Sequence, residues 1–268
     1  MRKRPGDLDL VPLIEYENLN IVRERRHLLS DINLKIAQGE HVAVLGPNGA
    51  GKSTLIKTVT REYYPSAGSG RSVVRILGEE FWDIFELRNH LGIVSGELVH
   101  SNLREITCFD FVLSGFFSSL GLWPGQHVTT FMKRKVTQIL GLLDIQPLAN
   151  RDMNTLSTGE ARRLMIARCL VHDPPTILMD EPTSSLDLKA TYELRATLRK
   201  LAQRGKSLIM ITQNLSDIIP EIERVILLKN GRIVRDGPKE ECLTSSCLSE
   251  LFGIDLDLLQ KGGYYFCY

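Results

Sequence analysis

The sequence has no long apolar run and no excess of charge of one sign. In its 268 residues the longest apolar stretch, 111–123, is broken by serines and glycines and is too short to span a bilayer. Its 33 Lys and Arg oppose 32 Asp and Glu, so no global field attracts nucleic acid or an anionic membrane. We therefore expect no direct membrane insertion and no nucleic-acid partner.

Cysteine and histidine are few, and neither occurs at the spacing of metal ligands. The five cysteines contain no C-x-x-C and the six histidines no H-x-x-x-H, which argues against a structural zinc site. Reduced thiols in the cytosol fit this usage best. No apolar segment follows Arg2-Lys3-Arg4, so we expect no signal peptide. With 43% hydrophobic and 24% charged residues, the composition is typical of a soluble protein.

A glycine-rich loop is the strongest local pattern that is present. It lies between an apolar run, 41–45, and a segment with helical character, 55–59, which is the context of a phosphate-binding loop. Backbone N–H groups and the helix dipole favour a phosphate there, while Lys52 reaches the β/γ oxygens and Ser53 ligates Mg²⁺. The predicted nucleoside triphosphate site comprises Gly46, Pro47, Asn48, Gly49, Ala50, Gly51, Lys52, Ser53 and Thr54.

A pair of acidic residues follows a second apolar run, 176–179. Asp180 at the end of a strand is suited to hold Mg²⁺ through water, and Glu181 to polarise the attacking water as general base. Taken alone, this pair has an equal alternative reading as an ordinary strand end. The phosphate loop earlier in the chain favours the functional interpretation.

A third candidate element is the start of a helix at Ser157-Thr158-Gly159-Glu160. These residues either cap the helix or, by the same physics, form an anion site from free N–H groups and the helix dipole. One chain cannot usefully present two γ-phosphate cradles to one nucleotide, whereas a second copy can. We therefore expect a homodimer across ATP.

The periodicity of apolar residues indicates both kinds of sheet. Residues 13–21 and 28–36 alternate apolar and polar side chains and, with 42–45, predict an N-terminal antiparallel patch that leads into the phosphate loop. Asn230-Gly231 between two apolar runs predicts a hairpin. Elsewhere strands and helices alternate, which predicts an α/β fold with a parallel sheet covered by helices. The further predicted strands are 73–77, 176–179 and 207–211, and the predicted helices 109–120, 132–143, 159–172 and 189–203.

Four motifs together resemble the ABC ATPase family, over about 13–237. They are a Walker A (46–54), a signature LSTGE (156–160), a Walker B (177–182) and a D-loop (184–187) that ends in Asp187. The resemblance implies a P-loop NTPase with a RecA-like parallel core, an antiparallel β patch and an inserted helical subdomain at about 84–160. We expect a C-terminal helical tail over 238–268. The resemblance also implies ATP and Mg²⁺, and a partner whose signature closes on the γ-phosphate.

The chain departs from the family pattern at three positions. Gly96 stands where the family has the Q-loop Gln, and Gln213 where it has the switch His; Gln213 can hydrogen-bond the γ-phosphate but carries no charge. Val22 or Arg23 replaces the adenine-stacking aromatic, and Arg23 either stacks through its guanidinium or is a solvated arginine. Residues 94–123 resemble the ModF/YlmA-like branch, with the core of the helical subdomain as the plainer interpretation.

These observations favour an ATP-hydrolysing subunit that powers a separate membrane permease. Such a subunit is expected in the cytoplasm, peripheral at the inner face of the membrane where a permease is bound. The alternative is a soluble, non-transport ABC ATPase that acts as a regulatory or repair switch. A third possibility is a module that binds ATP but scarcely hydrolyses it, and the presence of Lys52, Ser53, Asp180 and Glu181 counts against it.

Overall fold

The structure is a computed structural model that describes residues 11–66, 71–95 and 106–268. It divides into two compact units, each described here by itself. The first unit consists of the described residues of Met1–Ile84 and Ser207–Tyr268, and the second of those of Phe85–Lys206. None of the helices in these described ranges has the length and apolarity needed to cross a membrane.

An antiparallel sheet in the first unit has the strand order β2-β1-β4. Its strands are β1 (Ile14–Arg23), β2 (Arg26–Ile36) and β4 (Val73–Ile76). In β2 buried Leu29, Ile32, Leu34 and Ile36 are separated by exposed or half-buried residues, the alternation that predicted this strand. The predicted antiparallel patch is therefore confirmed for its two long strands.

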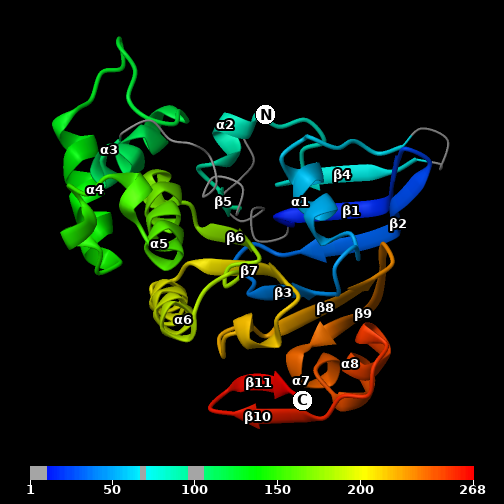
Figure 1. The fold of residues 1–268 in the computed structure, drawn as a ribbon. Coiled ribbons are helices and arrows are strands. Elements are labelled where there is room, and N and C mark those ends of the chain that lie inside the picture. The colour runs from blue at the N-terminus through cyan, green and yellow to red at the C-terminus, as the bar shows by residue number, and fades with distance from the viewer. Residues whose placement is uncertain (1–10, 67–70, 96–105) are drawn as a thin grey trace. The chain divides into compact units, whose positions relative to one another are not determined.

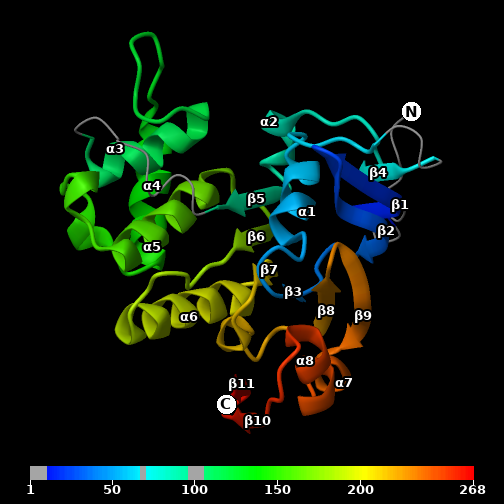
Figure 2. The ribbon, with the colours of Figure 1, turned by 45° about the vertical axis from the view of Figure 1, so that its right-hand side comes forward.

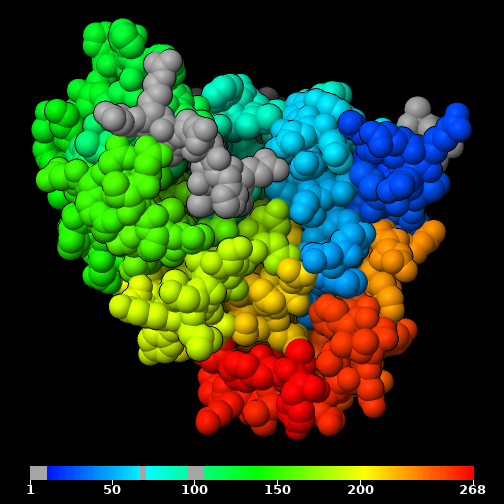
Figure 3. All heavy atoms as spheres, in the orientation of Figure 1, coloured from blue at the N-terminus to red at the C-terminus, as the bar shows by residue number. Residues whose placement is uncertain are grey.

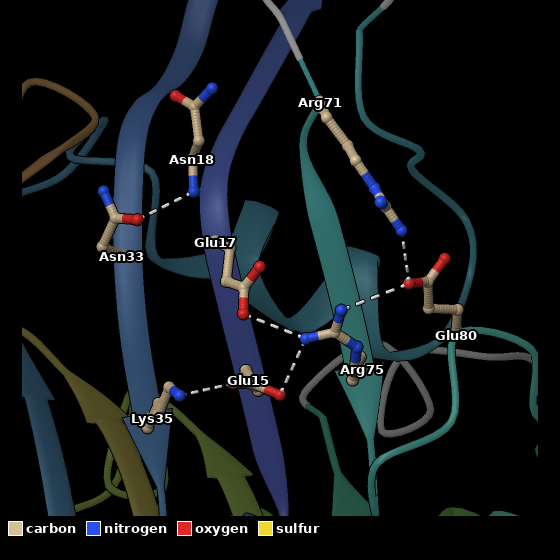
Figure 4. Close-up of polar contacts among 8 residues, drawn as sticks. All are labelled: Glu15, Glu17, Asn18, Asn33, Lys35, Arg71, Arg75 and Glu80. Atoms are coloured by element: carbon tan, nitrogen blue, oxygen red, sulfur yellow. Dashed lines mark hydrogen bonds and ion pairs between the residues drawn. The ribbon is translucent and has the colours of Figure 1, made fainter.

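Charged residues line the other face of this sheet (Figure 4). Glu15 on β1 lies opposite both Lys35 on β2 and Arg75 on β4, and binds them at 2.7 and 3.2 Å. Arg75 also contacts Glu17 at 3.0 Å and Glu80 at 3.4 Å. Cross-strand pairs of opposite charge stabilise a particular register.

A second, mainly parallel sheet in the first unit has β3 (Val42–Leu45) at its centre (Figures 1 and 2). β3 pairs in parallel with β7 (Ser207–Thr212) and with β8 (Arg224–Lys229). Our assignment of 42–45 to the antiparallel patch is thus wrong. All four residues of β3 are buried, as in a strand covered on both faces. In the antiparallel sheet, β4 pairs with β1 and is the third strand, the place predicted for 42–45.

The predicted hairpin joins β8 to β9 (Arg232–Pro238), which are antiparallel. Asn230 and Gly231 have φ of 50° and 73°. Two successive positive φ angles are those of a type I′ turn, which matches the twist of the flanking strands.

The C-terminal region begins with α7 (Lys239–Cys242) and α8 (Ser245–Phe252). It then forms a hairpin of β10 (Leu258–Lys261) and β11 (Tyr264–Cys267). The prediction of a helical tail over 238–268 is therefore wrong for its last part. Gly253 ends α8 with a φ of 72°, and Gly262-Gly263, both with positive φ, reverse the chain.

The second unit holds most of the helices. They are α2 (Ile84–Leu87), which begins at the junction of the units, α3 (Cys108–Leu113), α4 (Thr130–Leu142), α5 (Thr158–Cys169) and α6 (Leu188–Gln203). Its strands β5 (Leu91–Val94) and β6 (Thr176–Asp180) pair in parallel. β5 lies within a segment predicted to be mainly helical, because a short buried strand and a buried helical turn share one apolar pattern.

α3 is shorter than the predicted helix 109–120. A 3₁₀ turn, Ser114–Phe117, follows it, and the Arg168 guanidinium of α5 donates to the Phe111 and Ser119 carbonyls at 2.8 Å each. Arg168 thus supplies partners that a continued helix would have supplied. Phe111 is buried while Trp123 is exposed, so the aromatic stretch is partly core and partly surface.

Candidate active site

The loop between β3 and α1 (Lys52–Val59) follows a path that two glycines make possible. A Cβ on Gly46 would lie 2.2 Å from the Leu228 carbonyl oxygen. Gly51 has a φ of 104°, and a Cβ there would lie 2.7 Å from the Leu28 carbonyl oxygen. Side chains at either position would therefore displace the loop backbone.

Backbone hydrogen bonds hold this loop to its neighbours within the first unit. Gly46 N–H donates to the Thr212 carbonyl of β7 at 3.2 Å. Gly231 N–H donates to the Ala50 carbonyl at 2.9 Å, and Ser30 N–H donates to the Gly231 carbonyl at 2.8 Å. The sequence predicts Asn230-Gly231 only as a turn; its support of the phosphate loop depends on the pairing of distant strands.

The first residue of α1 places a positive charge in the loop. Lys52 is only 6% exposed, and its ammonium donates to the Gly46 and Pro47 carbonyls at 2.9 and 3.1 Å. Among the residues described, the start of α1 has neither a side-chain cap nor an acidic residue in its first turn. Its N–H groups and dipole therefore favour an anionic ligand, and the exposed Ser53 hydroxyl follows directly.

Gln213 leaves the sheet at the same edge as the loop. Leu45 and Thr212 are in register in the parallel pair β3–β7, so Gly46 and Gln213 both follow at the carboxyl end of the strands. The Thr212 hydroxyl donates to the buried Asp217 carboxylate at 2.5 Å and accepts from Asn214 N–H at 2.9 Å. The backbone on both sides of Gln213 is thereby fixed, and the sequence gives no signal for Asp217 in this role.

Arg23 lies at the end of β1. Its guanidinium carbon is 4.7 Å from the ring centroid of Tyr63, which follows α1. This cation–π contact covers one face of the guanidinium. Stacking of Arg23 on a nucleotide base stays a prediction.

In the second unit the acidic pair lies at the carboxyl end of β6, which pairs in parallel with β5. Asp180 ends β6, and Glu181 follows with a φ of 45°. A residue with a side chain adopts this left-handed conformation at a cost of about 1–3 kcal/mol, and such residues cluster at functional sites. Eleven other described residues with side chains also have a positive φ, so the motif rather than the backbone conformation marks Glu181.

The start of α5 has the helix cap, which is one of the two alternatives that the sequence suggested. Ser157 caps the helix: its hydroxyl accepts from Glu160 N–H at 3.3 Å, and the Glu160 carboxylate accepts from Ser157 N–H at 2.8 Å. Burial alone would raise the pKa of Glu160, but these bonds and Arg151, at 2.9 Å, lower it. Ser157 and Thr158 are exposed and therefore accessible to a ligand. An anion site at this helix start stays a prediction.

The signature and the D-loop adjoin within the second unit. A Cβ on Gly159 would lie 2.6 Å from the Ala190 Cβ, so the starts of α5 and α6 approach closely. Asp187 caps α6 by accepting from Ala190 N–H at 2.7 Å. Gly96 lies outside the described residues.

Together, the strand, the tight glycine loop with its buried lysine and the uncapped helix define a P-loop nucleoside triphosphatase. The chain belongs to the ABC transporter family, whose model matches residues 29–184.

Similar proteins extend this match over most of the chain. The ABC transporter ATP-binding protein YlmA of Bacillus subtilis is 31% identical over 92% of this chain and 93% of its own. The hemin import ATP-binding protein HmuV of Escherichia coli O157:H7 is 33% identical over 92% of this chain and 95% of its own. The ATP-binding cassette MJ0796, solved as a dimer in a post-hydrolysis state with ADP and Pi, is 28% identical with a TM-score of 0.68, covering 84% of this chain and 98% of that one.

Proposed function

We propose that this chain is the ATP-hydrolysing subunit of an ABC transporter, working as a homodimer that encloses ATP and drives a separate membrane permease. The observation that carries the proposal is the buried Lys52 ammonium in the glycine loop at the uncapped start of α1. The names of the relatives point the same way, since YlmA and HmuV are both described as ATP-binding proteins of transport systems. None of these names suggests a regulatory or repair switch.

The residues of this chain suit each requirement of phosphoryl transfer. The loop N–H groups and Lys52 bind the phosphates of ATP, and Gln213 donates to the γ-phosphate from the same edge of the sheet. Glu181 accepts a proton from the attacking water as general base. Arg23 is the candidate contact for the adenine base.

Mg²⁺ fits the oxygen donors that two residues offer. The Ser53 hydroxyl and the Asp180 carboxylate are hard ligands of the kind this ion prefers, and Asp180 is half-buried at a strand end. When bound, Mg²⁺ neutralises charge on the β- and γ-phosphates.

A second copy of the chain completes the site in this proposal. It contributes the signature residues Ser157, Thr158, Gly159 and Glu160 together with Asp187. Beside Asp187, Leu188 is 92% exposed and Tyr192 is 75% exposed. Large solvent-exposed apolar side chains beside the signature and the D-loop support an interface with another copy.

An exposed aromatic cluster in the first unit is the candidate surface for the permease. Tyr64 is 61% exposed and Phe81 is 80% exposed, and the Arg61 guanidinium carbon lies 5.9 and 5.7 Å from their ring centroids. Trp82 adds a third ring at 5.1 Å from the same carbon. Aromatic and arginine side chains are enriched where proteins bind one another. With the permease bound, the chain lies in the cytoplasm at the inner face of the membrane.

The ATPase activity is tested by removing the charge in the loop. Lys52→Ala should lower the Mg-ATP hydrolysis rate on the order of 100-fold or more, because a donor to the transferring phosphoryl group is lost. Lys57→Ala, on the same helix, is the matched control and should hydrolyse ATP at nearly the wild-type rate. Equal rates for wild type and Lys52→Ala would refute the assignment of the loop.

The transport role is tested by affinity purification of the tagged chain from membranes of its native host, followed by identification of the proteins that remain bound to it. Affinity-tagged protein should recover a multi-span permease. Recovery of soluble proteins alone would favour the regulatory or repair alternative instead.

A further inference from the structure

The C-terminal hairpin lies against the segment that contains Gln213. β11 packs on the 3₁₀ turn Leu215–Asp217, which begins two residues after Gln213 (Figure 1). An open pocket of about 320 Å³ is lined by residues of both segments. Gln213, Leu215, Tyr265 and Phe266 are among the residues that line it.

The hairpin is fixed at its turn and at its open end. A Cβ on Gly263 would lie 2.9 Å from the Pro220 Cγ, so the turn rests on the chain just after the 3₁₀ turn. At the open end, Asp257 and Tyr268 exchange backbone hydrogen bonds of 3.1 and 3.2 Å. Leu258 N–H donates to the Ser245 hydroxyl of α8 at 3.1 Å, and the hairpin and α8 form adjoining surfaces (Figure 3).

Tyr265 is the buried residue of this hairpin. It is 3% exposed, whereas Phe266 beside it is 41% exposed. Burial raises the pKa of the Tyr265 hydroxyl. A neutral, buried aromatic ring is a rigid support for the turn against which its strand packs.

We infer that Tyr265 is a positioning residue for ATP hydrolysis, acting through the 3₁₀ turn on Gln213. β11, in which Tyr265 is the buried residue, packs on Leu215–Asp217. Asp217 accepts from the Thr212 hydroxyl, which accepts from Asn214 N–H, so both neighbours of Gln213 are held. The inference rests on the proposed function, in which Gln213 contacts the γ-phosphate. Hydrolysis then depends on a C-terminal element that none of the nucleotide motifs includes.

A double-mutant cycle on the full-length chain tests this coupling. Tyr265→Ala should lower kcat about fivefold with KM for ATP little changed, a coupling of the size usual for residues linked through a shared cavity or a backbone shift. In the Gln213→Ala background the same substitution should change kcat less than twofold, since the group it positions is gone. Phe266→Ala, which opens the cavity without emptying the core, should show the same dependence on Gln213 with a smaller effect.

Controls separate positioning from loss of fold and from failure of the proposed function. Leu259→Ala, an exposed change on β10 outside the cavity, should keep wild-type kcat. Tyr265→Phe should restore most of kcat, because the ring remains. If wild type hydrolyses ATP but Tyr265→Ala and Phe266→Ala lower kcat equally with and without Gln213, the inference is wrong. If wild type does not hydrolyse ATP at all, the proposed function fails and the inference with it.

Discussion

At the scale of single residues, the site combines groups that each solve one physical problem. Gly46 and Gly51 allow backbone to pass where any Cβ would meet a carbonyl oxygen. Lys52 keeps a buried positive charge satisfied by two carbonyls of the loop. Gln213 offers an amide where a charged imidazolium would donate more strongly to a phosphate. In the proposed function, the first two features favour ATP binding and the third limits catalysis.

Gln213→His should therefore raise kcat. We expect an increase of about tenfold, less than the 10²–10³ that removal of a whole transition-state donor typically costs, because glutamine already donates. KM for ATP should change little if the contact belongs to the transition state. Steady-state kinetics with Asn214→His as the neighbouring control measures this, and an unchanged or lower kcat in Gln213→His would show a site tuned around glutamine.

At the scale of elements, the two kinds of strand differ in how far sequence predicts them. β2 alternates because one of its faces is buried, so period and extent are readable. β3 and β5 are four-residue strands, too short for a period, and their partners lie far along the chain. Pairing and register then depend on tertiary context, which explains the misplacement of 42–45 and the missed strand 91–94.

The candidate site also has features that local sequence predicts and others that depend on the tertiary fold. The roles proposed for Lys52, Asp180 and Glu181 come from short local motifs with a physical mechanism. The Asp217–Thr212 bond and the Gly231–Ala50 bond join segments that only the folded chain brings together. No local pattern predicts such contacts.

The ion pairs of Glu15, Glu17, Lys35 and Arg75 form a row on the antiparallel sheet, and we expect their contribution to stability to depend on pH. The hydrogen bond from Lys35 is the largest influence on Glu15 and, with Arg75, lowers its pKa below the ordinary 4.5. Its stabilising contribution is therefore complete above about pH 4.5 and is lost as the pH falls through the lowered value. Glu15→Gln should cost about 1 kcal/mol of unfolding free energy at pH 7, a modest value because Lys35 is largely exposed.

Urea unfolding at two pH values checks this dependence. The difference between wild type and Glu15→Gln should be full at pH 7 and should shrink as the pH falls through the lowered pKa, because the wild-type carboxylate then also becomes protonated. Glu79→Gln, outside the row, serves as the control. A difference that is the same at both pH values would show that packing rather than charge explains the loss.

At the scale of the whole molecule, the proposed chemistry is divided between the two units. Lys52, Ser53 and Gln213 belong to the first unit, while Asp180 and Glu181 belong to the second, as do the signature and Asp187. Each unit alone therefore holds an incomplete set of groups for hydrolysis. Exposed Leu188 and Tyr192 beside Asp187 leave surface for the second copy that the proposed ATP sandwich requires.

The mass of Glu181→Gln in solution with Mg-ATP is the most direct test of this account. Without the general base, ATP should be bound but hydrolysed slowly, so sedimentation should find twice the mass of one chain. Lys52→Ala should remain a monomer. Ser157→Arg should also remain a monomer, because the arginine side chain fills the proposed anion site. Ser157→Gly should still dimerise, because it loses only the cap hydroxyl. A Glu181→Gln chain that stays monomeric at saturating Mg-ATP would contradict the two-site ATP sandwich.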